Sequence, residues 1–224
     1  MKKYAVIVAG GKGERMENSL PKQFIEVNGL PLVMHTMNLF CRSDVRPELI
    51  LVLPRAYFKI WRDLCLAHGF NAGHVLAESG PERFHSVKSG LRNVGEDDAI
   101  VAVHDAVRPL VSLKVISRVY KDAELYGSAV PVVPVTESVR ERTGANNRPA
   151  DRNRLFLVQT PQCFRASILK RAYLQAYREE FTDDATVVET NGQQIHLVDG
   201  NPENIKITTP ADLLMAEALL KKYQ

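Results

Sequence analysis

The chain has 224 residues, of which 45% are hydrophobic and 25% are charged, and its 29 basic and 26 acidic residues leave a net charge of +3. A chain of this length can bury one full-sized hydrophobic core, so a single domain is the default expectation. The two signs of charge are interspersed without a long run of either, and this pattern argues against a nucleic-acid partner.

Cysteine spacing and hydropathy bear on the compartment. The three cysteines lie far apart, without a CxxC pair or a paired histidine spacing: Cys41, Cys65 and Cys163. This pattern indicates neither a disulfide framework nor a zinc site, and it favours a reducing compartment, the cytoplasm. Two lysines and a short apolar run at the start imitate a signal peptide, but glycines and charges from Gly10 onward break the run. No stretch approaches the roughly 20 apolar residues of a membrane span, so we expect no membrane association.

Short β-rich apolar runs alternate with amphipathic segments, which indicates an α/β sheet covered on both faces by crossover helices. In chain order we expect a strand over 4–9, a helix starting at Pro31, a strand over 49–53, helices over 57–68 and 83–94, a strand over 99–104, a helix over 113–126 and a strand over 129–133. Further on we expect helices over 166–180 and 184–191, strands over 194–198 and 205–208, and a last helix that starts after Thr209 with Pro210 at its first position and Asp212 completing a capping pattern.

Residues 136–154 interrupt this alternation. They are polar, charged and turn-rich, with too few apolar residues to join the core. We interpret them as a projecting arm or hairpin, and a disordered surface loop remains the alternative, because a polar insert of this length is usually either functional or mobile.

The segment 8–16, VAGGKGERM, follows the first predicted strand directly, and LPKQ follows at 20–23. Gly10, Gly11 and Gly13 allow a backbone turn to bring its N–H groups close to a phosphate chain. Arg15 and Lys22 are cations that could neutralise charge developing on a phosphorus atom. The segment therefore predicts a site for a phosphorylated nucleotide.

Two other phosphate-binding patterns do not fit this loop. The Walker pattern fails because no Gly-Lys pair is followed by Ser or Thr with the required upstream glycine. The dinucleotide fingerprint fails because Met16 stands where Gly or Ala is needed. A glycine-rich turn alone is often only structural, but here the two cations accompany it.

A second group, HDAVRP at 104–109, lies at the carboxyl end of an apolar strand, where open α/β sheets place their ligand sites. An ionised Asp105 there is a natural Mg²⁺ ligand, since Mg²⁺ takes one or two carboxylates together with phosphate oxygens and water. Arg108 would bind a phosphate. Asp105 could instead only cap the following turn, and we interpret His104 as structural.

A third group consists of DRN at 151–153, QTPQ at 159–162, TDDA at 182–185 and NIKIT at 204–208. Taken singly, each resembles a helix cap or a surface charge. Lys206 differs, because a long cation within an apolar, strand-like run suggests an anionic partner.

Together, and in this order, the motifs resemble those of the cytidylyltransferases that act on 2-C-methyl-D-erythritol 4-phosphate, over essentially the full chain. The resemblance implies a single nucleotidyltransferase domain over 1–224 with a Rossmann-like, mostly parallel sheet and helices on both faces. It also implies a β-arm at about 136–154 used for homodimerisation, Mg²⁺ as cofactor, CTP and a polyol phosphate as substrates, and a place in non-mevalonate isoprenoid precursor synthesis.

The resemblance also carries roles to individual positions. It makes Arg15 and Lys22 the pair that stabilises the transition state. The CTP-binding positions it implies are Ala9, Gly10, Gly11, Gly13, Gly80, Ser86 and Ala106. The positions it implies for the second substrate are Asp105, Arg108, Ser138, Arg152, Thr160, Thr182 and Lys206. Within that set Asp105 also holds the metal, and Ser138 and Arg152 reach across from the partner's arm.

Three positions depart from the family pattern. Gly10 and Gly11 stand where Ala-Gly is common, and Ser138 stands where the family has Thr. Both changes should be tolerated, because the backbone stays permissive and the hydroxyl is kept. Pro81 replaces an Asp and has neither a carboxylate nor an N–H, so its side chain offers no polar contact to the nucleotide at this position.

Two alternatives stay open at this point. Ribitol-5-phosphate cytidylyltransferases share the AGGKG, HDAVRP and NIKITTP strings, whereas DRN at 151–153 and TDDA at 182–185 favour the methylerythritol enzymes. A non-catalytic nucleotide-binding module would need its cations for affinity alone, and the presence of Arg15, Lys22 and Asp105 together argues against it.

Overall fold

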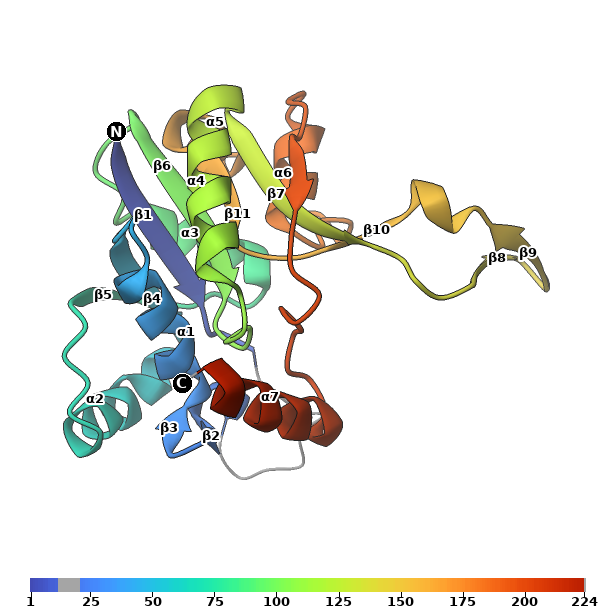
Figure 1. Ribbon diagram of the computed structural model, residues 1–224. Coiled ribbons are helices and arrows are strands. Elements are labelled where there is room, and N and C mark those ends of the chain that lie inside the picture. The colour runs from blue at the N-terminus through green and yellow to red at the C-terminus, as the bar shows by residue number, and fades with distance from the viewer. Residues whose placement is uncertain (12–20, 224) are drawn as a thin grey trace.

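The computed structural model describes residues 1–11 and 21–223, and Figure 1 shows their arrangement around one central sheet. The strand order is β10-β7-β11-β6-β1-β4-β5, and β12 also pairs with β7. The strands are β1 (Lys2–Val8), β4 (Glu48–Leu53), β5 (His74–Glu78), β6 (Ala99–Asp105), β7 (Ser128–Pro134), β10 (Phe156–Val158), β11 (Gln162–Arg165) and β12 (Leu197–Asp199). The pairs among β1, β4, β5 and β6 are parallel, whereas β10 and β11 run antiparallel to their neighbours. The expected mostly parallel α/β sheet is confirmed.

Helices cover both faces of this sheet, as Figure 1 shows. They are α1 (Leu32–Arg42), α2 (Phe58–Ala67), α3 (Arg83–Leu91), α4 (Leu113–Tyr126), α5 (Ala166–Ala172), α6 (Asp184–Thr190) and α7 (Pro210–Tyr223). Successive residues of β1 point to opposite faces: Ala5 and Ile7 pack with α1 and α4, whereas Tyr4 and Val6 pack with α3, α5 and α6. Because both faces are buried, the central strands are continuous apolar runs.

Smaller elements complete the carboxyl edge of the sheet. A short hairpin of β2 (Glu26–Val27) and β3 (Leu30–Pro31) precedes α1. Helix α7 packs on it through a third apolar cluster that includes Val27, Ile207 and Leu220. The hydroxyl of Thr209 and the carboxylate of Asp212 exchange bonds with each other's backbone N–H, as the capping pattern predicted. None of the helices described here combines the length and the apolar surface that crossing a bilayer requires.

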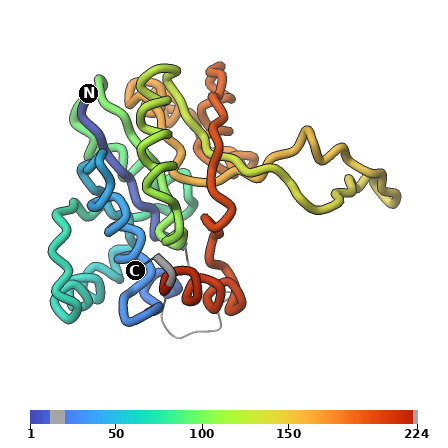
Figure 2. The backbone as a smooth tube through the Cα atoms, viewed as in Figure 1, coloured from blue at the N-terminus to red at the C-terminus, as the bar shows by residue number. Residues whose placement is uncertain are grey.

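The insert at 136–154 contains a two-stranded antiparallel hairpin of β8 (Val139–Thr143) and β9 (Asn146–Ala150). Gly144, at a φ of 65°, makes the turn between them. Figure 2 shows that this arm extends away from the rest of the chain. The structure therefore confirms the predicted projecting hairpin and not the alternative, a disordered loop.

Several element predictions were wrong, in their bounds or in their type. The helix expected over 166–180 stops at Ala172, because Tyr173 and Phe181 both stack on Phe84, with ring centroids 4.7 and 5.5 Å away. A continuous helix would separate these two rings by about 12 Å along its axis, so the chain must turn back. Residues 205–208 are not a strand: their Ile207 N–H bonds to the Val107 carbonyl, 3.0 Å away, without a ladder. The strand expected from 194 begins at Leu197.

Candidate active site

A pocket of about 890 Å³ opens at the carboxyl ends of β1, β4 and β6. Val8 and Asp105, the last residues of β1 and β6, form part of its wall. This edge is where open α/β sheets bind ligands. The pocket brings together eight predicted site residues from five separate stretches of the chain: Ala9, Gly10, Gly11, Lys22, Gly80, Ser86, Asp105 and Lys206.

The glycine loop leaves β1 at one side of this pocket. The Ala9 N–H donates to the Val52 carbonyl at 2.9 Å, and the Gln23 amide donates to the Ala9 carbonyl at 2.9 Å. A Cβ on Gly10 would lie only 3.1 Å from the side chain of Ser86, so glycine allows the loop to approach the segment around residue 80. Lys22 lies beside the loop, with its Cε 3.7 Å from the position of a Cβ on Gly11. Predicted residues Gly13 and Arg15 lie outside the described residues.

The segment at 79–82 forms the opposite wall and leads into α3. The Gly80 N–H donates to the Ser86 hydroxyl oxygen at 3.1 Å, which ties the loop to the first turn of the helix. A Cβ on Gly80 would lie 2.3 Å from the Cβ of His85, so only glycine fits at this position. Pro81 also lines the pocket.

Asp105 is the centre of a charged cluster at the base of the pocket. Its carboxylate oxygens lie 3.4 Å from Arg83 Nε, 3.4 Å from Arg108 Nε and 3.0 Å from Lys206 Nζ. Burial opposes ionisation of this carboxyl, but the charges of Arg83, Lys206 and Arg108 outweigh it and lower the pKa of Asp105 far below its usual value. Asp105 is therefore a carboxylate at any physiological pH.

The sequence prediction gave no individual role to Arg83, the last residue of the loop at 80–83, or to Asp184, which lies in the TDDA motif at 182–185. The Arg83 guanidinium donates to Asp184 at 2.7 Å while its Nε faces Asp105, and the Tyr173 hydroxyl donates to Asp184 at 2.6 Å. Asp184 is completely buried. Burial disfavours the Arg83 cation, but the charges of Asp184 and Asp105 raise the pKa of Arg83 well above its usual value. An acidic residue at a helix start resembles a cap in sequence, which is why the bond from Arg83 to Asp184 was not predicted.

Three predicted residues lie behind the pocket wall. Ala106 is completely buried. Arg108 donates to the Asn204 carbonyl at 2.7 Å, and desolvation lowers the pKa of its guanidinium. Thr160 is also buried, and its hydroxyl oxygen accepts the Asp105 N–H at 3.2 Å. These residues shape the loop that carries Asp105.

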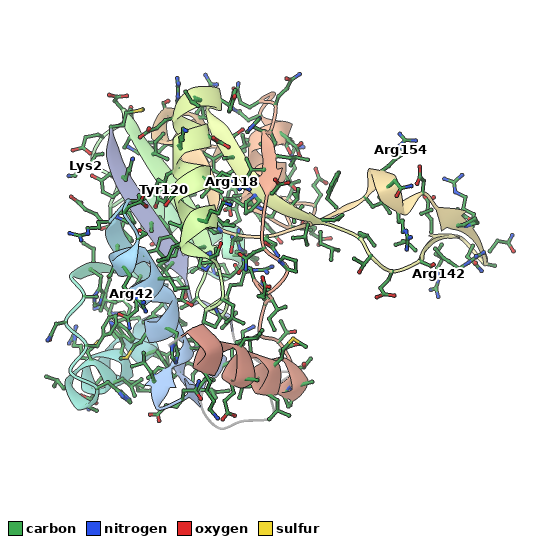
Figure 3. The ribbon with its side chains drawn as sticks, in the orientation of Figure 1. Lys2, Arg42, Arg118, Tyr120, Arg142 and Arg154 are labelled. Carbon is green, nitrogen blue, oxygen red and sulfur yellow. The ribbon has the colours of Figure 1, made fainter. Side chains whose placement is uncertain are left out.

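Three other predicted residues lie elsewhere. Thr182 is exposed, just before Asp183, which caps α6. Ser138 and Arg152 are exposed residues of the insert, and Arg152 donates to the Thr136 carbonyl at 2.5 Å. Figure 3 shows the arm, with the labelled Arg142 and Arg154 on it, projecting from the body of the chain. The structure therefore does not bring Ser138 or Arg152 to the pocket of their own chain.

Gly10, Gly11, Lys22 and the ionised Asp105 line one pocket at the carboxyl edge of a mostly parallel sheet. This fold and site define an α/β protein of the nucleotidyltransferase class. A sequence profile described as 2-C-methyl-D-erythritol 4-phosphate cytidylyltransferase matches residues 4–222. The chain belongs to this family.

Comparisons with individual relatives lead to the same family. The chain is 50% identical over 216 residues to the 2-C-methyl-D-erythritol 4-phosphate cytidylyltransferase of Bacteroides fragilis, covering 96% of this chain and 98% of that protein. It is also 50% identical over 220 residues to that of Bacteroides thetaiotaomicron, covering 98% and 100%. Among solved structures, the Thermus thermophilus enzyme of the same name superposes with a TM-score of 0.81 at 33% identity, covering 99% of this chain and 100% of that one.

Proposed function

We propose that this chain transfers CMP from CTP to 2-C-methyl-D-erythritol 4-phosphate, giving 4-diphosphocytidyl-2-C-methyl-D-erythritol and pyrophosphate. Relatives that are 50% identical over almost the whole chain carry this name. One observation carries the proposal furthest: Gly10, Gly11 and Lys22 line the same pocket as Asp105 and Lys206. A triphosphate and a second anionic substrate can thus meet in one cavity.

In this reaction a phosphate oxygen of the acceptor attacks the α-phosphorus of CTP in line. The new P–O bond forms as the bond to the bridging oxygen of the β-phosphate breaks, and pyrophosphate leaves with that electron pair. No side-chain nucleophile is needed, because positioning and electrostatics lower the barrier. We assign Lys22 and Arg15 to the charge that builds up on the α-phosphate.

Asp105 suits a Mg²⁺ ion that takes its remaining ligands from phosphate and water, because it is an ionised carboxylate on the pocket wall. Its contact with Lys206 at 3.0 Å would yield when the ion binds. When bound, the ion neutralises phosphate charge and polarises the α-phosphorus. Among the described residues no cluster of three or more metal-binding side chains competes with this assignment.

We assign the nucleotide to the Gly10 side of the pocket, with Gly80 and Ser86 against the cytidine, and the acceptor to the Asp105 side. The acceptor positions are Arg108, Thr160, Thr182 and Lys206, completed by Ser138 and Arg152 of the partner subunit. The exposed arm and the exposed apolar residues at its base, 155–158, support a homodimer, because an uncovered apolar edge strand favours pairing. The three free cysteines support a reducing compartment, the cytoplasm.

Coexpression of two inactive variants tests this shared site. In a dimer that combines Lys22→Ala with Arg152→Ala, one site keeps both wild-type residues if Arg152 acts in the partner's pocket. Random pairing should then restore activity to about a quarter of the wild-type sites. If the mixture stays as inactive as its parents, Arg152 does not act across the interface.

Pyrophosphate release tests the substrates. It is measured with methylerythritol phosphate and with ribitol 5-phosphate, each in the presence of CTP or of UTP. We expect methylerythritol phosphate with CTP to be the best pair, and mass spectrometry to find the diphosphocytidyl product. Faster turnover with ribitol 5-phosphate would make the chain a ribitol-phosphate cytidylyltransferase. No pyrophosphate release with any pair would make it a non-catalytic nucleotide-binding module.

A further inference from the structure

His104 is a completely buried histidine directly before the pocket carboxylate Asp105. Its ring lies edge-on to Phe40, with centroids 5.2 Å apart. Both ring nitrogens have partners: Nε2 lies 3.1 Å from the carbonyl oxygen of Arg108, and Nδ1 lies 3.0 Å from the hydroxyl of Thr160. Neither partner is solvent, so this histidine is tied to the loop it precedes.

The direction of these bonds follows from their chemistry. A carbonyl oxygen can only accept, so His104 Nε2 carries a proton and donates to Arg108. The ring is completely buried, and the neutral tautomer with its one proton on Nε2 satisfies both contacts, so Nδ1 accepts. The Thr160 hydroxyl therefore donates to Nδ1, while its oxygen accepts the Asp105 N–H at 3.2 Å. One chain of bonds thus runs from Asp105 through Thr160 and His104 to Arg108.

This chain of hydrogen bonds continues the pairing of β6 with β11 where the backbone ladder ends. Strand β11 pairs with β6 from Gln162 opposite Val103, and the residue before it, Pro161, has no N–H and cannot extend the ladder. The Thr160 side chain supplies the acceptor for the Asp105 N–H instead. At the other end of the loop, the imidazole of His104 holds the carbonyl of Arg108.

Other backbone groups of the loop are also held. The Ala106 N–H donates to the Val8 carbonyl at 3.0 Å, and the Ala106 carbonyl accepts from the Thr36 hydroxyl at 2.8 Å. The Val107 carbonyl accepts from the Ile207 N–H at 3.0 Å. The Arg108 N–H also donates to the Asp105 carbonyl at 3.1 Å. The His104–Thr160 pair adds a second link between the two charged ends of the loop, through side chains.

We propose that His104 and Thr160 are positioning residues that fix the loop 105–108, and with it the Asp105 carboxylate and the Arg108 guanidinium, for binding the acceptor phosphate. This inference rests on the proposed function for the identity of the acceptor. It also changes the expected role of Thr160: its hydroxyl proton is used by His104, so Thr160 serves the substrate through the loop rather than by donating to it.

The tautomer of His104 can be tested without an activity assay. In protein labelled with ¹⁵N-histidine at pH 7, NMR should show His104 protonated at Nε2 and unprotonated at Nδ1. A ring protonated at Nδ1 would overturn the proposal. This readout does not depend on which substrates the enzyme uses.

Kinetics test the consequence. Thr160→Val keeps side-chain volume and His104→Phe introduces a somewhat larger ring, and both remove the bonds. We expect kcat/KM for the acceptor to fall about 10- to 100-fold, because a misplacement of about 1 Å can cost that much. The dissociation constant for CTP should change less than about threefold, and Thr160→Ser should recover most of the loss seen in Thr160→Val. If His104→Phe does not fold, Thr160→Val and Thr160→Ser carry the test.

Tyr120→Phe is the matched control. It removes another buried hydroxyl, that of a residue of α4, which donates to the carbonyl of Tyr4 in β1 at 2.7 Å. A merely structural role for the His104–Thr160 pair predicts that all these variants lose stability and that folded Thr160→Val keeps the acceptor kinetics of Tyr120→Phe. That result would overturn the proposal. If the wild-type chain makes no product, the proposed function fails, whereas the NMR result still decides the bonding.

Discussion

Gly80 offers a sharp test of how the nucleotide side of the pocket is built. In Gly80→Ala the new Cβ would lie 2.3 Å from His85 Cβ, 3.1 Å from its carbonyl carbon and 3.2 Å from its Cα. Carbon atoms in good contact lie about 3.5 Å apart, so the loop and α3 must separate by roughly 1.2 Å. Two of the three close atoms belong to the backbone, so a rotamer change cannot relieve the clash.

Overpacking of this kind costs about 1–3 kcal/mol of stability, or a few degrees in Tm for a chain of this size. The same displacement pulls Gly80 away from Ser86, to which its N–H donates at 3.1 Å. Since these residues contact the cytidine in our proposal, we expect CTP affinity to fall at least about tenfold.

Calorimetric titration with CTP and thermal unfolding measure both effects. Gly73→Ala is the control, because a Cβ on Gly73 meets nothing within 4 Å. It should bind CTP and unfold like the wild type. If Gly80→Ala also bound CTP with wild-type affinity, the assignment of this loop to the nucleotide would be refuted.

Three further substitutions probe separate parts of the molecule. Lys22→Ala should lower kcat about 100- to 1,000-fold without changing Tm, as measured by pyrophosphate release, and unchanged turnover would remove Lys22 from the mechanism. Asp184→Asn should lower the free energy of unfolding by about 3–5 kcal/mol in urea titrations, because it leaves the partly buried Arg83 without its closest counter-charge. Tyr173→Phe should cost only about 1 kcal/mol, and equal losses in the two variants would contradict this. Asp212→Asn should cost about 1 kcal/mol at pH 7. Burial opposes the Asp212 charge, but N–H groups and hydroxyls just before α7 lower its pKa in the folded state, so its stabilisation is present at neutral pH and lost in acid. The difference between wild type and Asp212→Asn should therefore shrink as pH falls, and a constant difference would refute it.

The elements that sequence predicted well are those whose signal is local. Helix α4, over Leu113–Tyr126, has the predicted bounds because its apolar face is regular along its whole length and Gly127 ends it at a φ of 87°. Strands β1 and β6 are apolar on both faces and therefore stand out as continuous runs. Strands β10 and β11 were not predicted, because they have three and four residues and take their place only through pairing with β7 and β6.

The candidate site also consists of parts with a local sequence signal and parts without one. The glycine loop and the residues around Asp105 are contiguous motifs, and both could be found without a structure. The bond between Arg83 and Asp184 joins residues 101 positions apart, and although Asp184 lies in the TDDA motif, nothing in the sequence pairs it with Arg83. His104 was interpreted as structural from its position on a buried strand, and its bonds to both ends of the 105–108 segment become visible only in three dimensions.

A crystal structure with CTP and Mg²⁺ tests the central claim most directly. We predict the triphosphate against the backbone of Gly10 and Gly11, with Lys22 Nζ within hydrogen-bond distance of the α-phosphate and the cytosine beside Gly80. A triphosphate bound away from the glycine loop, with Lys22 turned from it, would contradict the account.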